Sequence, residues 1–175
     1  MDPRVHYVQG KAEFVTDLLS LLHELYRDKL TLLLRHEAAA RHIGQYDINN
    51  TYQYIINRED VQLSWIATAI TELDGTVPES ADAERIVAGK GAAAAHAVIE
   101  EDVRETQAFV DRWRPRVDGM SNARHAKMLQ VILGEALEQK RFFEQALAGR
   151  TDLLGRRADV LGPSHGEVLP TRWIE

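Results

Sequence analysis

The amino-acid sequence predicts an all-α protein: a four-helix bundle of two antiparallel hairpins joined by a long crossover, followed by an extended C-terminal tail. Two observations predict this class. Apolar residues recur at three- and four-residue steps in four segments of helical length. The breaks after the first and third segments are short, whereas the break after the second is much longer. With 175 residues, 45% of them hydrophobic and 27% charged, the chain has the composition of one soluble domain with a real core.

The first hairpin is expected from helices at about residues 11–43 and 50–73. On the first, one face carries Leu19, Leu22, Tyr26, Leu30, Leu33, Glu37 and Ala40. Gly44 suits a C-cap, and the Asp and Asn residues between positions 47 and 50 supply turn and N-cap chemistry. On the second, one face carries Tyr52, Ile55, Glu59, Gln62, Leu63, Ile66, Ile70 and Leu73. Asp74-Gly75 then ends the helix.

The second hairpin is expected from helices at about residues 91–113 and 122–148. Pro115 is predicted to end the third helix, because proline lacks the backbone N–H that a helix needs. Ser121 or Asn122 can cap the fourth helix, and Gly149 follows its end. The intervening segment at about 74–90 could span roughly 55 Å if stretched, whereas a 24-residue helix is about 36 Å long. It can therefore run the full length of the bundle.

Two regions follow from this pattern: a bundle at residues 1–149 and a tail at residues 150–175. The tail contains Gly and Pro and has no helical period. Its apolar residues are too many for a free linker: Leu161, Val168, Leu169, Trp173 and Ile174. We expect the tail to pack on its own bundle or on a second subunit.

Four glutamates on or beside the apolar faces are predicted to lie at one height: Glu37, Glu59, Glu101 and Glu135. Within each hairpin the two glutamates are about equally far from the connecting turn, so they should face each other. A crossover along the whole bundle would bring the two pairs level. Burying an unpaired carboxylate costs several kcal/mol, so converging glutamates indicate a metal site or internal ion pairs.

This arrangement, with one inward Glu on each helix, resembles the ferritin-like superfamily and its rubrerythrin-type members over about residues 11–148. That family has Glu-x-x-His on its second and fourth helices. Here the second helix reads Glu59-Asp60-Val61-Gln62 and the fourth reads Glu135-Ala136-Leu137-Glu138, so both histidines are absent.

The resemblance implies a carboxylate-rich di-metal site for two iron ions, or manganese instead, bridged by Glu59 and Glu135. Its ligands would be Glu37, Glu59, Gln62, Glu101, Glu135 and Glu138. The implied activity is iron storage or the oxygen and peroxide chemistry of a di-iron oxidoreductase. His36 or His125, near apolar faces, could replace the missing nitrogen ligands.

The alternative is a bundle without metal or catalysis that acts in self-association or partner binding. The carboxylates would then pair with arginines, and Arg41, Arg58 and Arg104 are the candidates. Asp102 also fits the apolar face of its helix better than Glu101 does.

Composition excludes several other classes. A net charge of -6 disfavours nucleic acid as a partner, and the absence of cysteine excludes disulfides, thiolate metal sites and iron–sulfur clusters. An apolar run long enough for a signal peptide or a membrane span is lacking, so we expect a cytoplasmic protein, and we expect it to form a homodimer. Nothing resembling a phosphate loop or a nucleophile elbow identifies a small-molecule substrate.

Overall fold

The computed structural model describes residues 3–79, 85 and 89–154, with side chains from residue 15 onward. Four helices form the fold: α1 (Pro3–Ala40), α2 (Tyr46–Thr71), α3 (Gly91–Asp118) and α4 (Ala123–Leu147). The predicted all-α class is confirmed, and the described residues contain no strand. They also contain no helix long and apolar enough to cross a membrane.

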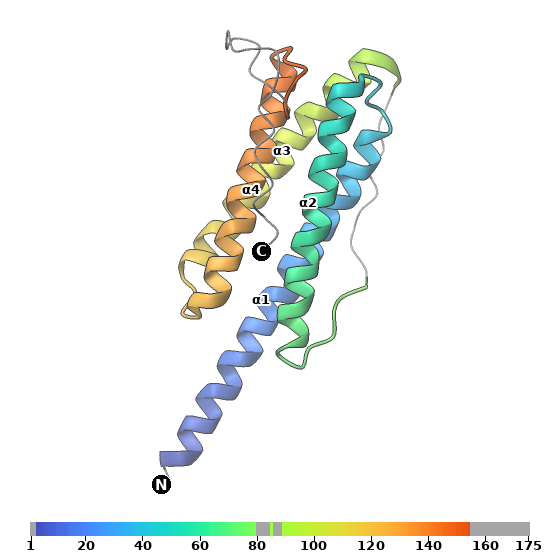
Figure 1. Cartoon of the computed structure of the whole chain (residues 1–175). Coiled ribbons are helices and arrows are strands. Elements are labelled where there is room, and N and C mark those ends of the chain that lie inside the picture. Colours follow the sequence, from blue (N-terminus) through green and yellow to red (C-terminus); the bar gives the residue numbers. More distant parts are fainter. Residues whose placement is uncertain (1–2, 80–84, 86–88, 155–175) are drawn as a thin grey trace, which may run out of the picture.

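The helices pair as two hairpins. α1 packs along α2, and α3 packs along α4, with further contacts of α1 with α3 and of α2 with α4 (Figure 1). Short connections join the partners of each hairpin, whereas α2 and α3, which are separated by 19 residues of sequence, run in the same direction along the bundle. The predicted long crossover is therefore confirmed. The predicted tail lies outside the described residues from position 155 on.

The helix ends differ from those predicted. α1 begins at Pro3, where proline suits a first helical position, and its N-terminal end extends past the rest of the bundle (Figure 1). α3 continues through Pro115 to Asp118, so the prediction that Pro115 ends it was wrong. The physical reason is packing: Val117 is 1% exposed and belongs to the main apolar cluster. Its burial favours one more turn despite the proline.

Asn49 stabilises a different helix end from the one its position suggested. α2 begins before it, and the N-cap Gln45 makes no side-chain capping hydrogen bond. The Asn49 side-chain amide instead donates to the carbonyl of Ala40, at 2.8 Å, and so satisfies a free carbonyl at the end of α1. At α4 the prediction is confirmed, because the Asn122 side chain accepts from the backbone N–H of His125 at 3.1 Å.

Gly75, at the start of the crossover, permits close packing against α1. A Cβ atom there would lie 2.4 Å from Leu19 Cδ1 and 2.9 Å from Ile70 Cγ2. Only glycine therefore fits without displacing the side chains that anchor the crossover to the bundle.

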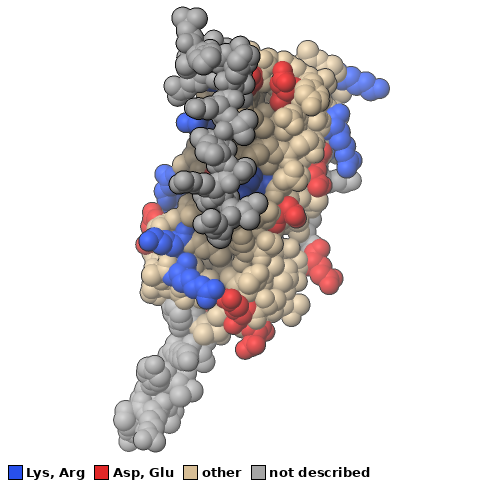
Figure 2. Space-filling view, viewed as in Figure 1, with Lys and Arg blue, Asp and Glu red and all other residues tan. Residues whose placement is uncertain are grey.

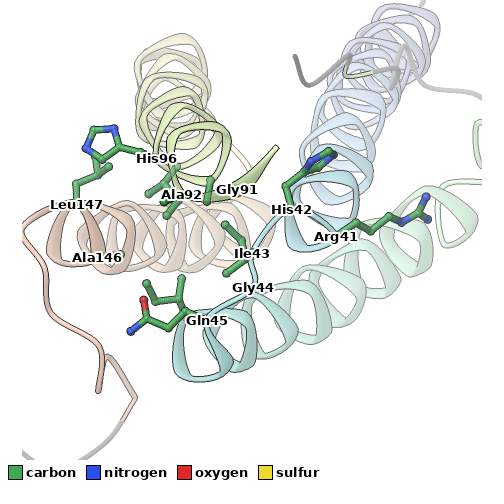
Figure 3. Close-up of a pocket in the computed structure, with 13 residues that line it drawn as sticks. Arg41, His42, Ile43, Gly44, Gln45, Gly91, Ala92, His96, Ala146 and Leu147 are labelled. Atoms are coloured by element: carbon green, nitrogen blue, oxygen red, sulfur yellow. The ribbon is translucent and has the colours of Figure 1, made fainter. Parts of the chain in front are cut away.

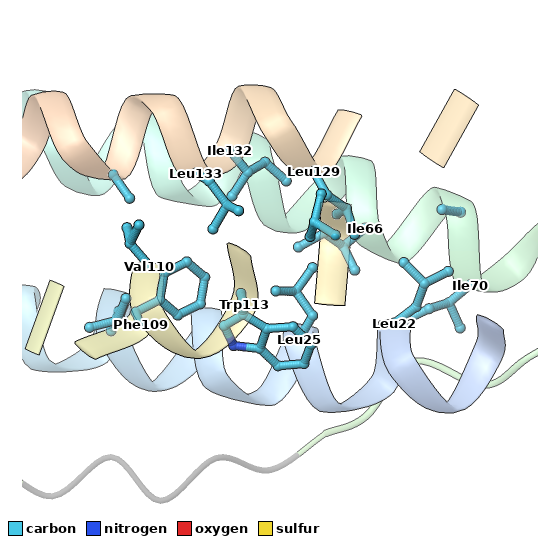
Figure 4. Packing of buried hydrophobic residues seen from close by; sticks show 14 of the residues in the cluster. Leu22, Leu25, Ile66, Ile70, Phe109, Val110, Trp113, Leu129, Ile132 and Leu133 are labelled. Carbon is cyan, nitrogen blue, oxygen red and sulfur yellow. The ribbon is translucent and has the colours of Figure 1, made fainter. Parts of the chain in front are cut away.

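Two apolar clusters fill the interior. The larger surrounds Trp113 and includes Leu22, Leu25, Ile66, Ile70, Phe109, Val110, Leu129, Ile132 and Leu133 (Figure 4). The smaller lies toward the α1–α2 turn and includes Ile43, Ile48, Tyr52, Ile99, Phe143 and Leu153. Each helix contributes to the two clusters from separate parts of its sequence. The middle zone of the bundle is the region between the two clusters.

Candidate functional site

Buried polar side chains lie in this middle zone or beside it, and each of the four helices contributes to them. We call this set the polar layer: Lys29, His36, Glu59, Gln62, Asp102, Thr106 and Gln139, all between 0% and 3% exposed. Polar groups survive in a protein interior only when hydrogen bonds or opposite charges compensate for lost water. The layer is therefore the candidate functional site.

Glu59 of α2 lies at the centre of the layer, with both carboxylate oxygens paired. Lys29 Nζ is 2.8 Å from Oε1, and His36 Nδ1 is 2.8 Å from Oε2. All three side chains are fully buried. Lys29 and His36 are seven residues apart on α1, two helical turns, so they project from the same side of that helix. The Lys29 ammonium also lies 5.6 Å from the centroid of the Phe109 ring, a cation–π contact.

The neighbouring charges fix the ionisation of Glu59. Burial alone would raise the pKa of this carboxyl group, but the charges and hydrogen bonds of His36 and Lys29 lower it to about 2. Burial likewise lowers the pKa of His36, yet the attraction of Glu59 and Asp102 outweighs burial and raises the pKa above its usual value. The geometry thus favours an ionised Glu59 beside a cationic Lys29 and a readily protonated His36.

Asp102 of α3 is the second fully buried carboxylate. Its Oδ2 accepts from the Tyr52 hydroxyl at 2.5 Å, and its Oδ1 accepts from Arg85 Nη1 at 2.5 Å. Burial and the negative charge of Asp102 raise the pKa of Tyr52 well above its usual value, which keeps the hydroxyl protonated and donating. His36 Nε2 lies 3.8 Å from Asp102 Oδ1, so the two carboxylates of the layer share His36 as a neighbour.

Arg85 reaches this carboxylate from the crossover. Its side chain is 8% exposed, and its Nη2 also donates to Glu105 Oε2 at 2.6 Å. Glu105 in turn accepts from Arg35 of α1 at 2.5 Å. The crossover is thereby tied to α1 and α3 by charged hydrogen bonds, which are stronger than neutral ones.

Glu135 of α4 lies at the edge of the layer, and its side chain is 23% exposed. Gln62 Nε2 donates to its Oε2 at 2.5 Å, and Arg58 binds both oxygens, through Nε at 3.1 Å and Nη2 at 2.5 Å. Arg58 also lies over the Trp65 ring, at 5.9 Å. This bidentate pair connects α2 to α4.

The structure brings together three of the six residues predicted as metal ligands. These three are Glu59, Gln62 and Glu135. Gln62 lies one helical turn after Glu59 on α2 and donates a hydrogen bond to Glu135 of α4. Glu101 pairs instead with Arg104 and is 42% exposed, while Glu138 is exposed on α4. Glu37 is half-buried outside the layer.

On α1 and α3 the side chain that faces inward is the neighbour of the predicted glutamate. His36 and Asp102 are fully buried where Glu37 and Glu101 were expected. His36 thus enters the centre, as one of the two histidines considered. His125 instead lies near the start of α4, away from the layer. Of the arginines considered, Arg58 and Arg104 do pair with Glu135 and Glu101.

The residues of the layer do not fit a di-metal centre in this arrangement. Both oxygens of Glu59 and both oxygens of Glu135 already accept hydrogen bonds from cationic or amide groups. The two fully buried carboxylates, Glu59 and Asp102, are matched by Lys29 and Arg85, so a divalent ion would add uncompensated positive charge. Across the described part of the chain, no group of three His, Asp or Glu side chains is arranged to hold a metal.

Comparison with known proteins finds a solved structure with a similar fold. No protein-family model matches the chain, and no curated protein matches it. Among solved structures it is similar to the crystal structure of a protein from Xanthomonas campestris pv. campestris, with 13% sequence identity and a TM-score of 0.55. The similarity covers 78% of this chain and 92% of that one. At this identity the comparison shows a shared fold alone.

Proposed function

We propose that this chain is a ferritin-like bundle without catalytic metal ions, whose centre is held by charged side chains and which acts through self-association. One observation carries the proposal: Lys29 Nζ lies 2.8 Å from Glu59 Oε1 with both side chains fully buried. An ammonium group therefore neutralises the carboxylate that the family resemblance would assign to bridging two metals.

The di-iron oxidoreductase function would require this pair to separate. Glu59 would have to release Lys29 and His36, and the ammonium would then remain buried close to divalent ions. Leaving one partner of a buried ion pair uncompensated costs about 3–5 kcal/mol before any repulsion from the metal is counted. The proposal therefore favours charge pairing over metal binding.

We expect the purified protein to retain no iron or manganese after anaerobic loading with Fe²⁺ or Mn²⁺ and desalting. Lys29→Glu should retain about one ion per chain, because it replaces the ammonium with a third ligand beside Glu59 and His36. Elemental analysis gives the stoichiometry. Lys140→Glu, at a half-buried lysine that pairs with Glu144, is the matched control and should retain none. About two ions per chain in the unmodified protein would overturn the metal-free proposal and support the di-metal function.

The outer face shared by α2 and α4 supports self-association. Three large apolar side chains on this α2–α4 face are exposed: Tyr54 (41%), Val61 (39%) and Val131 (49%). The Arg58–Glu135 pair lies between Tyr54 and the two valines, since Tyr54 contacts Phe142 on the other side of that pair. Figure 2, in the same view as Figure 1, shows charges of both signs scattered among uncharged surface.

The occupant that best fits this face is a second copy of the chain. A two-fold axis near the Arg58–Glu135 pair would place each arginine opposite the other copy's glutamate. When the same face of two copies meets in this way, opposite charges lie against each other. The flanking apolar side chains would be covered in the same contact. Apolar side chains around an arginine are common at the centre of protein interfaces.

We expect light scattering to give a mass of about 40 kDa, twice the 19.8 kDa of the chain. Val131→Lys should reduce this to the mass of one chain, because it buries a charge in the contact. Gln130→Lys, an exposed neighbour that projects about 100° away around α4, is the matched control and should remain dimeric. A monomeric unmodified protein would contradict self-association and leave the metal-free centre unaffected.

A further inference from the structure

An apolar cavity of about 540 Å³ opens at the end of the bundle that holds the α1–α2 turn. Ile43 and Gln45 of that turn face Gly91 and Ala92 of α3 across it, whereas the Arg41 side chain extends away along α2 (Figure 3). The walls are mainly aliphatic: Ile43, Ile48, Ala95, Ile99, Ala146 and Leu147. A volume of this size is in the range of pockets that bury a ligand or several side chains.

The described chain turns back toward this cavity after α4. Ala146 and Leu147, in the last turn of α4, line it. Leu153 follows and is 7% exposed, in the same apolar cluster as the wall residues Ile43 and Ile48. The chain beyond α4 is therefore already anchored at this end of the bundle, two residues before position 155.

The residues from 155 to 175 have the composition to fill an apolar cavity. They include Val160, Leu161, Val168, Leu169, Trp173 and Ile174. Two exposed apolar residues also lie at this end of the bundle, Tyr46 (80% exposed) and Leu154 (41% exposed). At about 3.3–3.6 Å per residue, every one of these six side chains is within reach of a cavity that begins at Leu147.

We propose that residues 155–175 dock into this cavity of their own chain through their apolar side chains. The docking buries the half-exposed wall residues Ala95, Ala146 and Leu147 together with the apolar residues of the tail, which gives it a hydrophobic driving force. This inference is independent of whether the polar layer binds metal.

Hydrogen exchange on the full chain at monomeric dilution tests the proposal. Backbone amides in residues 155–175 are expected to exchange at least about tenfold more slowly than in a synthetic peptide of the same residues. Ala95→Trp, which fills the cavity from α3, should raise their exchange to the rate in the peptide. Ala97→Trp, an exposed position on the same helix that does not line the cavity, is the matched control and should leave them protected.

Three outcomes would overturn the proposal. Exchange at the peptide's rate in the unmodified chain would show that the segment does not dock. Protection that survives Ala95→Trp would place it elsewhere on the bundle. Protection that appears only as concentration rises would assign the contact to a second copy. If Ala95→Trp unfolds the chain by circular dichroism, Ala92→Trp, an exposed position in the first turn of α3 that also lines the cavity, replaces it.

Discussion

Replacing Lys29 with methionine is expected to lower the free energy of unfolding by about 3–5 kcal/mol, because it leaves Glu59 buried with one oxygen unpaired. Methionine nearly preserves the length of the side chain, so the loss is mainly electrostatic rather than a cavity effect. A typical domain is stable by only about 5–15 kcal/mol, so this substitution removes a large share. Urea denaturation monitored by circular dichroism measures the change.

Two further variants show whether the loss comes from the charge. Lys29→Met combined with Glu59→Leu removes both ions and should recover most of the stability, to within about 1–2 kcal/mol of the original protein. Lys140→Met breaks the Lys140–Glu144 pair, in which the glutamate is 48% exposed, and should cost less than about 1 kcal/mol. Equal losses for Lys29→Met and Lys140→Met would mean that the buried pair has no special energetic role.

The sequence was sufficient to predict the four helices and how they pair. Periodic apolar residues and connection lengths are local properties, and they determine which helices form hairpins. Helix ends were harder to predict because they depend on tertiary contacts. Val117 extends α3 past Pro115 by being buried, and Asn49 binds the Ala40 carbonyl of α1 rather than capping α2. Neither choice can be read from the spacing of residues.

The candidate site was predictable only in part. Glu59 and Gln62 lie on a clear apolar face, and both are fully buried. On α1 and α3 the predicted acids are one residue from the inward positions, and one residue rotates a side chain by about 100° around a helix. His36 and Asp102 therefore occupy the centre instead.

The cations of the site gave the weakest sequence signals. Lys29 is four residues after the buried Leu25 on the interior side of α1, but a lysine in such a position more often extends its amine to the surface. Arg85 belongs to the crossover, where no helical period indicates direction. Its contact with Asp102 joins residues that only the folded chain brings together.

The stability of the protein is expected to pass through a maximum in mildly acidic solution because of the two ionisable partners in the layer. Glu59 has a folded-state pKa of about 2 against a usual value of 4.5, so its contribution is present above pH 4.5 and is lost as pH falls toward 2. This contribution is on the order of 3 kcal/mol. His36 has a raised folded-state pKa, so its contribution is complete below pH 6.5 and is lost as pH rises through that raised pKa.

Urea denaturation from pH 2.5 to 9 measures the free energy of unfolding on both sides of the maximum. The loss on the acidic side (the acidic limb) and the loss near neutral pH are each compared between the original protein and a variant. The acidic limb should largely disappear in the Lys29→Met, Glu59→Leu variant, and the loss near neutral pH should disappear in His36→Gln. Glu24, whose pKa is lowered by its hydrogen bond to Arg116, still titrates in every variant, so its share cancels in the difference. Tyr52, Asp102 and Lys29 face His36, and Tyr52 keeps its proton across this range because burial and the charge of Asp102 raise its pKa well above the usual value. If the paired variant loses as much stability between pH 5 and 3 as the original protein, Glu59 is not the source of the acidic limb.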